Sequence, residues 1–255
     1  MGASNLVVSR VSLTSEGEWD ELIAGYWASW LDPFQATGEL TFAHLGTGSP
    51  AEQKAFSKVK NDLLNQARSD PDNTVWLKCV DVQLKRIIGG GMYKIYRSNP
   101  YRAGAPTPVA DWFPDGSEKR ALAEAMYRQL WAWRAKLMTE KHFCGCALWT
   151  LPEYRYQGAA GLILERFVRH ADEFQMEAYL EGSEMAVRLY EHYGFTVVSE
   201  EKLYFEPPDG TAGSADWWRL VHDLQSHPVS IMWRPVGGQQ GVKYPWEKDG
   251  PQSKL

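Results

Sequence analysis

The sequence predicts an α/β fold in one domain, with a mixed central sheet flanked by helices. From residue 143 to 205, strand-like runs alternate with helical patterns, which is typical of parallel or mixed sheets. Two earlier β-rich runs, separated by a short polar turn, suit an antiparallel hairpin. The chain has 255 residues, enough for one large core, and we place the domain at residues 1–236. Residues 237–255 are rich in Gly, Gln, Lys and Pro and predict a loosely ordered tail.

The N-terminal third predicts a strand at Val7 to Leu13 and two amphipathic helices. Apolar residues recur at helical spacing after Thr14 or Ser15, either of which can cap the first helix, and Asp32-Pro33 ends it. A glycine-rich loop is expected from Thr37 to Ser49. The second helix carries an apolar stripe and ends at Asp70-Pro71; its stripe residues are Ala55, Val59, Leu63 and Ala67.

The middle of the chain predicts a hairpin followed by a loop and a long helix. The hairpin strands are Thr74 to Val80 and Ile87 to Tyr96. Four prolines between Pro100 and Pro114 predict an irregular surface loop, which we consider as a lid over a substrate. A helix capped by Ser117 should then extend to about Met138, because its apolar residues form one stripe.

The rest of the domain supplies the alternating pattern. The predicted strands are Phe143 to Thr150, Glu177 to Glu181, Phe195 to Phe205 and Pro228 to Arg234. The predicted helices between them are Ala160 to Phe174, Met185 to Tyr193 and Asp216 to Leu224.

Charge and composition exclude several function classes. The net charge is −5 and no basic stripe is present, so we do not expect a nucleic-acid partner. No apolar stretch reaches the ~20 residues that cross a bilayer, and residues 1–10 lack an export signal pattern, so we expect a cytoplasmic protein without membrane association. Cys79, Cys144 and Cys146 lack metal-ligand spacing; we expect no metal and interpret them as buried thiols, with a Cys-Gly-Cys redox pair as the alternative.

Small residues join a predicted strand to a predicted helix between Thr150 and Gly161. Such a turn exposes unpaired backbone N–H groups at a positive helix end, a geometry that binds phosphates. Gly158 allows a tight turn, and Ala159, Ala160 and Gly161 keep side chains away from the amides. Taken by itself, this segment is better explained as an ordinary strand-to-helix connection, because glycine-rich turns are common.

Three motifs in this region resemble those of the GNAT acyltransferases. The family pattern Gln/Arg-x-x-Gly-x-Gly/Ala is matched by Arg155-Tyr156-Gln157-Gly158-Ala159-Ala160. Tyr179-Leu180-Glu181-Gly182-Ser183 is similar to the family's Leu-Glu-Ala-Ser strand end, and Leu189-Tyr190-Glu191-His192-Tyr193-Gly194-Phe195 to its Leu-Tyr-x-x-x-Gly-Phe. The resemblance is strongest over 143–198, and the upstream hairpin resembles that of fungal small-molecule GNAT proteins.

The resemblance implies a mixed sheet whose fourth and fifth strands splay apart around acetyl-CoA as the co-substrate. The pyrophosphate would bind the amides of the turn, with the pantetheine arm paired to the main chain of the fourth strand. The residues this implies for cofactor binding are Leu148, Thr150, Arg155, Gln157, Gly158, Ala159, Ala160, Gly161 and Ser183.

For catalysis, the resemblance places Tyr190 at the position of the acid that protonates the departing thiolate. Packing in the apolar face of its helix is the alternative role of this ring. Glu181 is the candidate general base, although a strand-end carboxylate can equally bind an arginine or the backbone. His142 is a second candidate base, because histidine titrates near neutral pH, or else an exposed residue at a strand start. A backbone N–H near Leu148 or Trp149 would stabilise the oxyanion.

We therefore expect an enzyme that moves an acetyl group directly from acetyl-CoA to an amine, or a hydroxyl, of a small molecule. Protein or peptide N-acetylation and a catalytically silent CoA-binding module are the alternatives. The protein could be a monomer or a homodimer. Aromatic residues could wall the acceptor pocket; the candidates are Trp27, Trp30, Phe34, Trp112 and Phe113.

Overall fold

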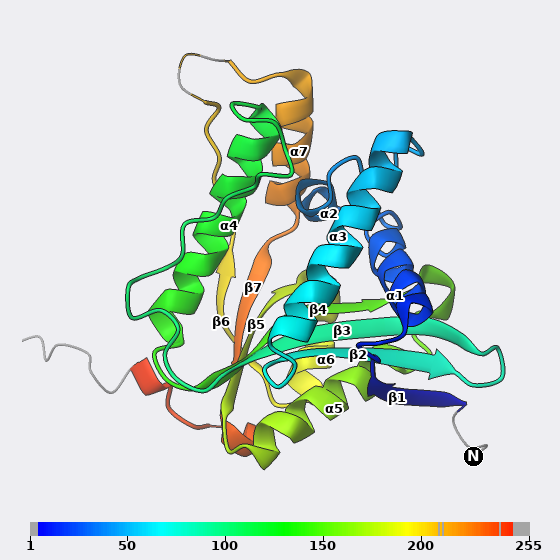
Figure 1. Cartoon of the computed structure of the whole chain (residues 1–255). Coiled ribbons are helices and arrows are strands. Elements are labelled where there is room, and N and C mark those ends of the chain that lie inside the picture. The colour runs from blue at the N-terminus through cyan, green and yellow to red at the C-terminus, as the bar shows by residue number, and fades with distance from the viewer. Residues whose placement is uncertain (1–4, 209, 211, 240, 247–255) are drawn as a thin grey trace, which may run out of the picture.

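The computed structural model describes residues 5–246 except positions 209, 211 and 240. Within this range a seven-stranded sheet has the order β1-β2-β3-β4-β5-β7-β6, and it forms the centre of the molecule (Figure 1). β4 and β5 pair in parallel, whereas the other neighbours are antiparallel, so the predicted mixed sheet is confirmed. The strands are β1 (Leu6–Arg10), β2 (Thr74–Asp81), β3 (Arg86–Tyr96), β4 (His142–Thr150), β5 (Glu177–Ser183), β6 (Thr196–Glu201) and β7 (Val229–Arg234).

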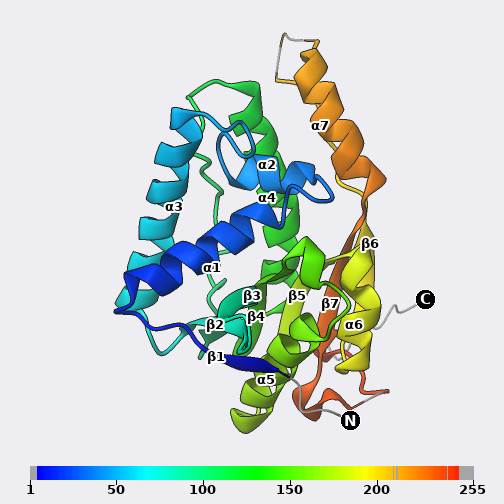
Figure 2. The ribbon, with the colours of Figure 1, turned by 90° about the vertical axis from the view of Figure 1, so that its right-hand side faces the viewer.

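Helices cover both faces of this sheet. α5 and α6 pack on one face, and α1, α3 and the C-terminal end of α4 pack on the other (Figures 1 and 2). Four of the longer helices, α1, α3, α4 and α7, begin where the sequence supplies a serine cap: the hydroxyls of Ser15, Ser49, Ser117 and Ser214 each accept from a backbone N–H three residues on. The helices are α1 (Glu16–Ala28), α2 (Ala36–Thr41), α3 (Pro50–Ser69), α4 (Glu118–Leu137), α5 (Ala159–Glu173), α6 (Val187–His192) and α7 (Ala215–Ser226).

Two elements differ from the sequence-based expectation. The short helix α2 lies partly in the segment expected to be a loop, where burial of Ala36 and Leu40 stabilises it. β6 ends at Glu201, although the prediction extended this strand to Phe205. Leu203 and Phe205 leave the sheet because they are buried against α4 and α7 instead. The predicted continuation of this strand beyond Glu201 is therefore wrong.

Trp149 fixes how α1 lies across the sheet. Its ring occupies a slot made by two glycines: a Cβ atom at Gly25 would lie 2.4 Å from Trp149 Cη2, and one at Gly90 would lie 2.8 Å from Trp149 Cε2. A side chain at either position would push the indole out. These glycines let α1 approach β3 and β4 closely.

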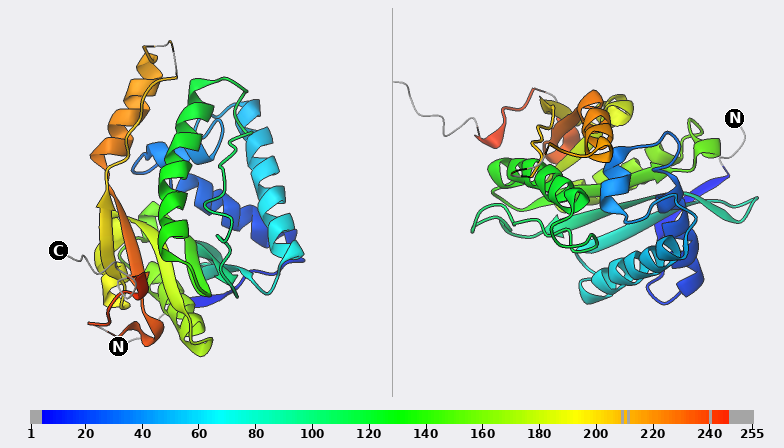
Figure 3. Two further views of the ribbon diagram at one scale, coloured as in Figure 1. Left: turned by 90° about the vertical axis from the view of Figure 1, so that its left-hand side faces the viewer. Right: turned by 90° about the horizontal axis from the view of Figure 1, so that it is seen from above.

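Two unusually long connections build a second core beside the sheet. β3 and β4 are antiparallel neighbours, yet residues 97–141 join them and contribute α4. β6 and β7 are joined by residues 202–228, which contribute α7. Antiparallel neighbours usually need only a few connecting residues. α4 and α7 pack with α2 around a separate apolar cluster, and we call these three helices the helical cap (Figure 3).

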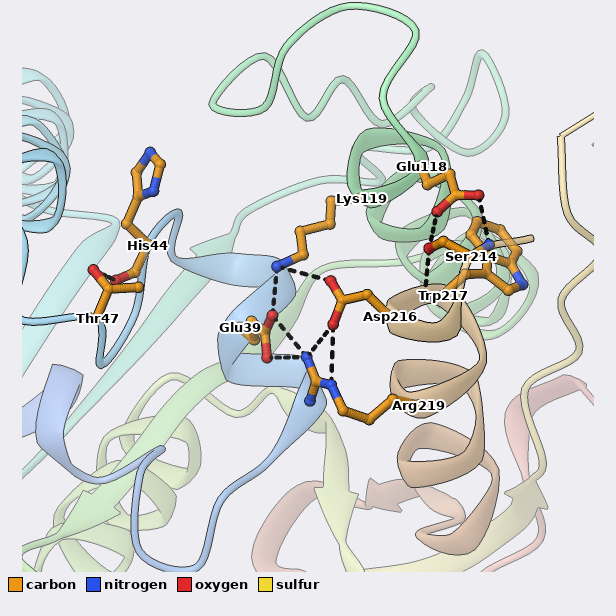
Figure 4. A network of polar contacts seen from close by, with 9 residues as sticks. All are labelled: Glu39, His44, Thr47, Glu118, Lys119, Ser214, Asp216, Trp217 and Arg219. Carbon is orange, nitrogen blue, oxygen red and sulfur yellow. Dashed lines mark hydrogen bonds and ion pairs between the residues drawn. The ribbon is translucent and has the colours of Figure 1, made fainter.

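Ion pairs tie the helical cap together at its outer end (Figure 4). Glu39 of α2 accepts from Lys119 Nζ of α4 at 2.6 Å and from Arg219 Nη2 of α7 at 2.8 Å. Asp216 pairs with the same two cations. One carboxylate from α2 thus binds both long connections.

The proline-containing loop does not lie over a cavity as a lid would. Tyr101 is buried with the end of α4, and Phe113 is buried within the helical cap. In the C-terminal segment, Tyr244 and Trp246 stack on each other and both pack against Trp233 of β7. The domain boundary at 236 stays a prediction.

Candidate functional site

The parallel strands β4 and β5 separate part of the way along their length. They pair only from His142 to Gly145 on β4 and from Glu177 to Leu180 on β5. Beyond Gly145 and Leu180 both strands continue without pairing to each other, as the resemblance implied for the fourth and fifth strands. A cavity of about 580 Å³ lies at this splay, and α1, β3, α5 and α6 complete its walls. Its volume is in the range of sites that enclose small ligands.

The turn before α5 forms one end of this cavity. Gly158 is the N-cap of α5 in the left-handed conformation, with φ of +95°, and nothing lies within 4 Å of where its Cβ atom would be. Gly158, Ala159, Ala160 and Gly161 all border the cavity. The first N–H groups of a helix have no partner within the helix, so this end is suited to an anion. Gly161 also permits close helix packing, because a Cβ atom there would lie 3.3 Å from the Tyr193 hydroxyl.

The polar residues of the turn have different positions. The Arg155 guanidinium borders the cavity and donates to the Asp32 carbonyl oxygen, which ties the turn to the segment after α1. The Gln157 side chain donates to the Glu153 carbonyl oxygen at 3.1 Å, and Gln157 is not among the residues that line the cavity. Tyr156, with φ of +61°, is fully exposed at the rim, and sequence analysis gave it no role.

Along the splayed strands, Leu148, Thr150 and Ser183 border the cavity. The Thr150 hydroxyl is buried and has no hydrogen-bond partner among the described residues. β4 contains a bulge, because Met92 pairs with Ala147 and Tyr93 pairs with Gly145, which leaves Cys146 unpaired with β3. The bulge begins where β4 and β5 part, and sequence patterns gave no sign of it.

Tyr190 lies in the cavity wall with its ring against β5. A Cβ atom at Gly182 would lie 2.9 Å from Tyr190 Cε2, so the glycine in this strand makes room for the ring. Tyr190 is 8% exposed and contacts Phe195 edge to face. Burial raises the pKa of Tyr190 to about 12, which keeps its hydroxyl protonated at neutral pH.

Glu181 borders the cavity from β5, and both of its carboxylate oxygens are engaged. Arg134 of α4 donates from Nε at 2.6 Å and from Nη2 at 2.7 Å, a bidentate pair. The two side chains are 19% and 9% exposed. Glu181 is thus bound by an arginine, which was one of the roles considered for it. The sequence did not indicate that Arg134 is this partner.

His142 was expected to be a candidate base or an exposed residue at a strand start, and both expectations are wrong. It is fully buried, packs between Tyr96 and Tyr101, and lies outside the cavity wall. Its Nδ1–H donates to the Glu140 carbonyl oxygen at 2.8 Å. Burial, helped by the Arg134 charge and opposed by the hydrogen bond to Glu140, lowers the pKa of His142 to about 4. It is neither exposed nor placed to act on a ligand in the cavity.

Aromatic side chains from α1 and the turn that follows it line the cavity on the sheet face opposite α5. Tyr26 and Trp30 contribute rings that lie 6.1 Å apart, and Ser29 and Gln35 lie beside them. Of the five aromatic residues considered for an acceptor wall, only Trp30 is in this group. The others are outside the cavity wall; for example, Trp27 donates to Glu52 and packs on Phe42, and Trp112 and Phe113 belong to the helical cap.

In the part of the chain that the structure describes, no helix combines the length and apolar character required to span a bilayer. No group of three or more His, Cys, Asp or Glu side chains in this part could hold a metal ion.

Solved structures with the same fold share little sequence with this chain. Arylalkylamine N-acetyltransferase 2 from Aedes aegypti is 13% identical, with a TM-score of 0.59 over 91% of this chain and 99% of that chain. The polyamine N-acetyltransferase of Drosophila melanogaster is 14% identical, with a TM-score of 0.52 over 89% and 98%. A histone acetyltransferase HPA2-related protein from Corynebacterium glutamicum is 14% identical, with a TM-score of 0.52 over 91% and 96%. No curated protein matches significantly.

The family model "Acetyltransferase (GNAT) family" matches residues 19–195, which include most of α1, the splayed strands and the turn before α5. This match covers more than half of the chain. The seven-stranded mixed sheet and its parting at β4 and β5 agree with it. The chain therefore belongs to the GNAT family of acetyltransferases.

Proposed function

We propose that this protein transfers an acetyl group from acetyl-CoA directly to an amine, or a hydroxyl, of a small molecule. The observation that carries this proposal is that one cavity borders both the anion-binding turn at Gly158 and the aromatic pair Tyr26 and Trp30. The first suits a pyrophosphate, and the second suits an apolar acceptor.

The residues of the splay fit acetyl-CoA. Small side chains from Gly158 to Gly161 leave the helix amides open to a pyrophosphate, and Arg155 adds a positive charge at the rim. β4 has main-chain groups beyond Gly145 that do not pair with β5, so an extended pantetheine arm can pair with Leu148 and Thr150 as an added strand would. Ser183 would line the opposite wall, on β5. The bound thioester would supply the acetyl group.

Tyr190 is the proposed acid. Its protonated hydroxyl has no protein partner among the described residues and can donate to the departing thiolate. Glu181 is the acidic side chain of the cavity wall and remains the proposed proton acceptor for the amine. Its pairing with Arg134 supports an alternative role in positioning. The pH profile of Glu181→Gln separates the two roles, because only loss of a base removes the acidic limb of the profile.

An acceptor of small size is supported by the aromatic pair on the acceptor side. Tyr26 and Trp30 present two tilted rings, 6.1 Å apart, that suit an apolar small-molecule amine. A panel of aromatic amines, aliphatic amines and peptides, scored by release of free thiol from acetyl-CoA, tests this point. Turnover of peptides alone would contradict a small-molecule acceptor, and no turnover with any acceptor would favour a silent CoA-binding module.

The first experiment is calorimetric titration of the parent, Gly158→Asp and Gly158→Asn with acetyl-CoA and with CoA. The carboxylate should repel the pyrophosphate and weaken binding by about 100-fold or more, since opposed like charges cost several kcal/mol. Asparagine has the same size and tolerates the left-handed backbone, so this control isolates charge from strain. Absence of binding to the parent would overturn the proposed function.

A further inference from the structure

Cys146 lies where the two splayed strands part. Gly145 is the last residue of β4 that pairs with β5, and Cys146 is the next residue and borders the cavity. The bulge leaves it unpaired with β3 as well. An extended chain that follows β4 back from Thr150 reaches Cys146 after about 13 Å, at ~3.3 Å per residue. Cys146 therefore stands at the inner end of the proposed pantetheine site.

The surroundings of Cys146 favour its thiolate. The Cys144 thiol, whose sulfur is 4.0 Å away, is the main group that lowers the pKa of Cys146, to about 7. Burial opposes this shift, while the charges of Arg134 and Lys94 support it and that of Glu181 counteracts it. By contrast, burial raises the pKa of Cys79 to about 11. A thiolate is the nucleophilic form of cysteine, so Cys146 combines access to the cavity with reactivity.

We propose that Cys146 is a site of reversible S-acetylation, filled from acetyl-CoA when no amine occupies the acceptor side. This inference rests on the proposed function. The Cys146 sulfur attacks the thioester carbonyl carbon, a new S–C bond forms, and the bond between that carbon and the CoA sulfur breaks. The proton that Cys146 gives up is balanced by the proton that the CoA thiolate takes up. No oxidant or reductant is required.

This modification should be readily reversed. One alkyl thioester is exchanged for another, so the reaction is nearly isoenergetic and its extent follows the ratio of acetyl-CoA to CoA. The acetyl group on Cys146 would fill the inner end of the cavity beside Tyr26 and Glu181. Direct transfer to an amine would then wait until the group returned to CoA. Acetylation of Cys146 would thus lower turnover when acetyl-CoA is abundant and acceptor is scarce.

The test is intact-mass measurement of the full chain after incubation with acetyl-CoA in the absence of amine and quenching in acid. We expect a gain of one acetyl group, mapped by peptide sequencing to Cys146 and removed by excess CoA. Cys146→Ser should lose the adduct, whereas Cys144→Ser should keep it, since this change leaves the Cys146 sulfur in place at the cavity.

Calorimetry on the same samples separates the two proposals. If the parent binds acetyl-CoA but gains no acetyl group, the inference is wrong and the proposed function stands. An adduct that persists in a Cys146→Ser variant with normal CoA binding would also overturn the inference. If the parent binds neither acetyl-CoA nor CoA, both proposals fail together.

Discussion

The two halves of the candidate site are built in different ways. The cofactor half comes from one continuous stretch, β4 through α6, and relies on small residues, main-chain groups and a helix end at Gly158. The acceptor half gathers side chains from α1, β4, β5 and the residues beside α2, with Arg134 of α4 behind them. A site that binds its ligand through main-chain groups tolerates side-chain substitutions at most positions. A site assembled from side chains far apart in the sequence depends on each of those side chains.

Removing Arg134 should show this dependence most strongly. Arg134→Met leaves the Glu181 carboxylate buried without its bidentate partner, which should lower the free energy of unfolding by about 3–5 kcal/mol. Urea denaturation measures this loss. The double variant Arg134→Met/Glu181→Met, which removes both charges, should recover most of it, and a double variant as unstable as the single one would contradict the explanation.

Tyr190 tests the cofactor half by chemistry rather than by stability. Tyr190→Phe keeps the ring that packs in the space left by Gly182 and removes only the hydroxyl. We expect kcat to fall about 100-fold, or ~3 kcal/mol in activation free energy, as is usual for loss of a general acid. The affinity for CoA should stay within about twofold, because the proposed binding contacts are mainly main-chain groups elsewhere. Unchanged kcat would assign Tyr190 to packing alone.

His142 makes the region beneath α4 sensitive to acid. Its pKa, near 6.5 in an unfolded chain, falls to about 4 in the fold because burial disfavours the cation. As the pH falls, His142 is protonated in the unfolded chain at a higher pH than in the fold. Protonation therefore lowers the free energy of unfolding, which is at its full value above pH 6.5 and decreases as the pH falls toward 4. When the pH is lowered from 7.5 to 4.5, the free energy of unfolding should decrease by roughly 2–3 kcal/mol less in His142→Phe than in the parent, as measured by urea denaturation at the two pH values. Equal losses would place the acid sensitivity elsewhere.

The ion pairs of the helical cap should have the smallest effect. Glu39→Gln weakens the contacts with Lys119 and Arg219, whose side chains are 37% and 47% exposed. Partly exposed pairs of this kind contribute about 1 kcal/mol or less. We expect a small decrease in the urea midpoint, lessened further at high salt, with no change in CoA titrations. A change in CoA affinity would mean that the cap and the cofactor half are coupled.

The contrast between the halves explains what could be predicted. The alternation of strands and helices after residue 143 and the three family motifs are local patterns, so the mixed sheet and the splay were predicted and are confirmed. Tyr190 and the turn residues were named from the same contiguous stretch. Predictions for the acceptor half were less successful: Trp27 and Phe113 are buried elsewhere, Trp112 packs half-buried against the helical cap, and Tyr26 was assigned only to a helix face.

The sequence by itself determined the family, the order of elements and the backbone turn at Gly158. Each of these depends on spacing along one segment and on the conformational freedom of glycine. Only the tertiary structure decided that Arg134 binds Glu181, that His142 is buried and that Cys146 stands at the parting of β4 and β5. These pairings join residues far apart in the chain or depend on a bulge, and no local pattern records which surfaces meet when two long connections fold back over a sheet.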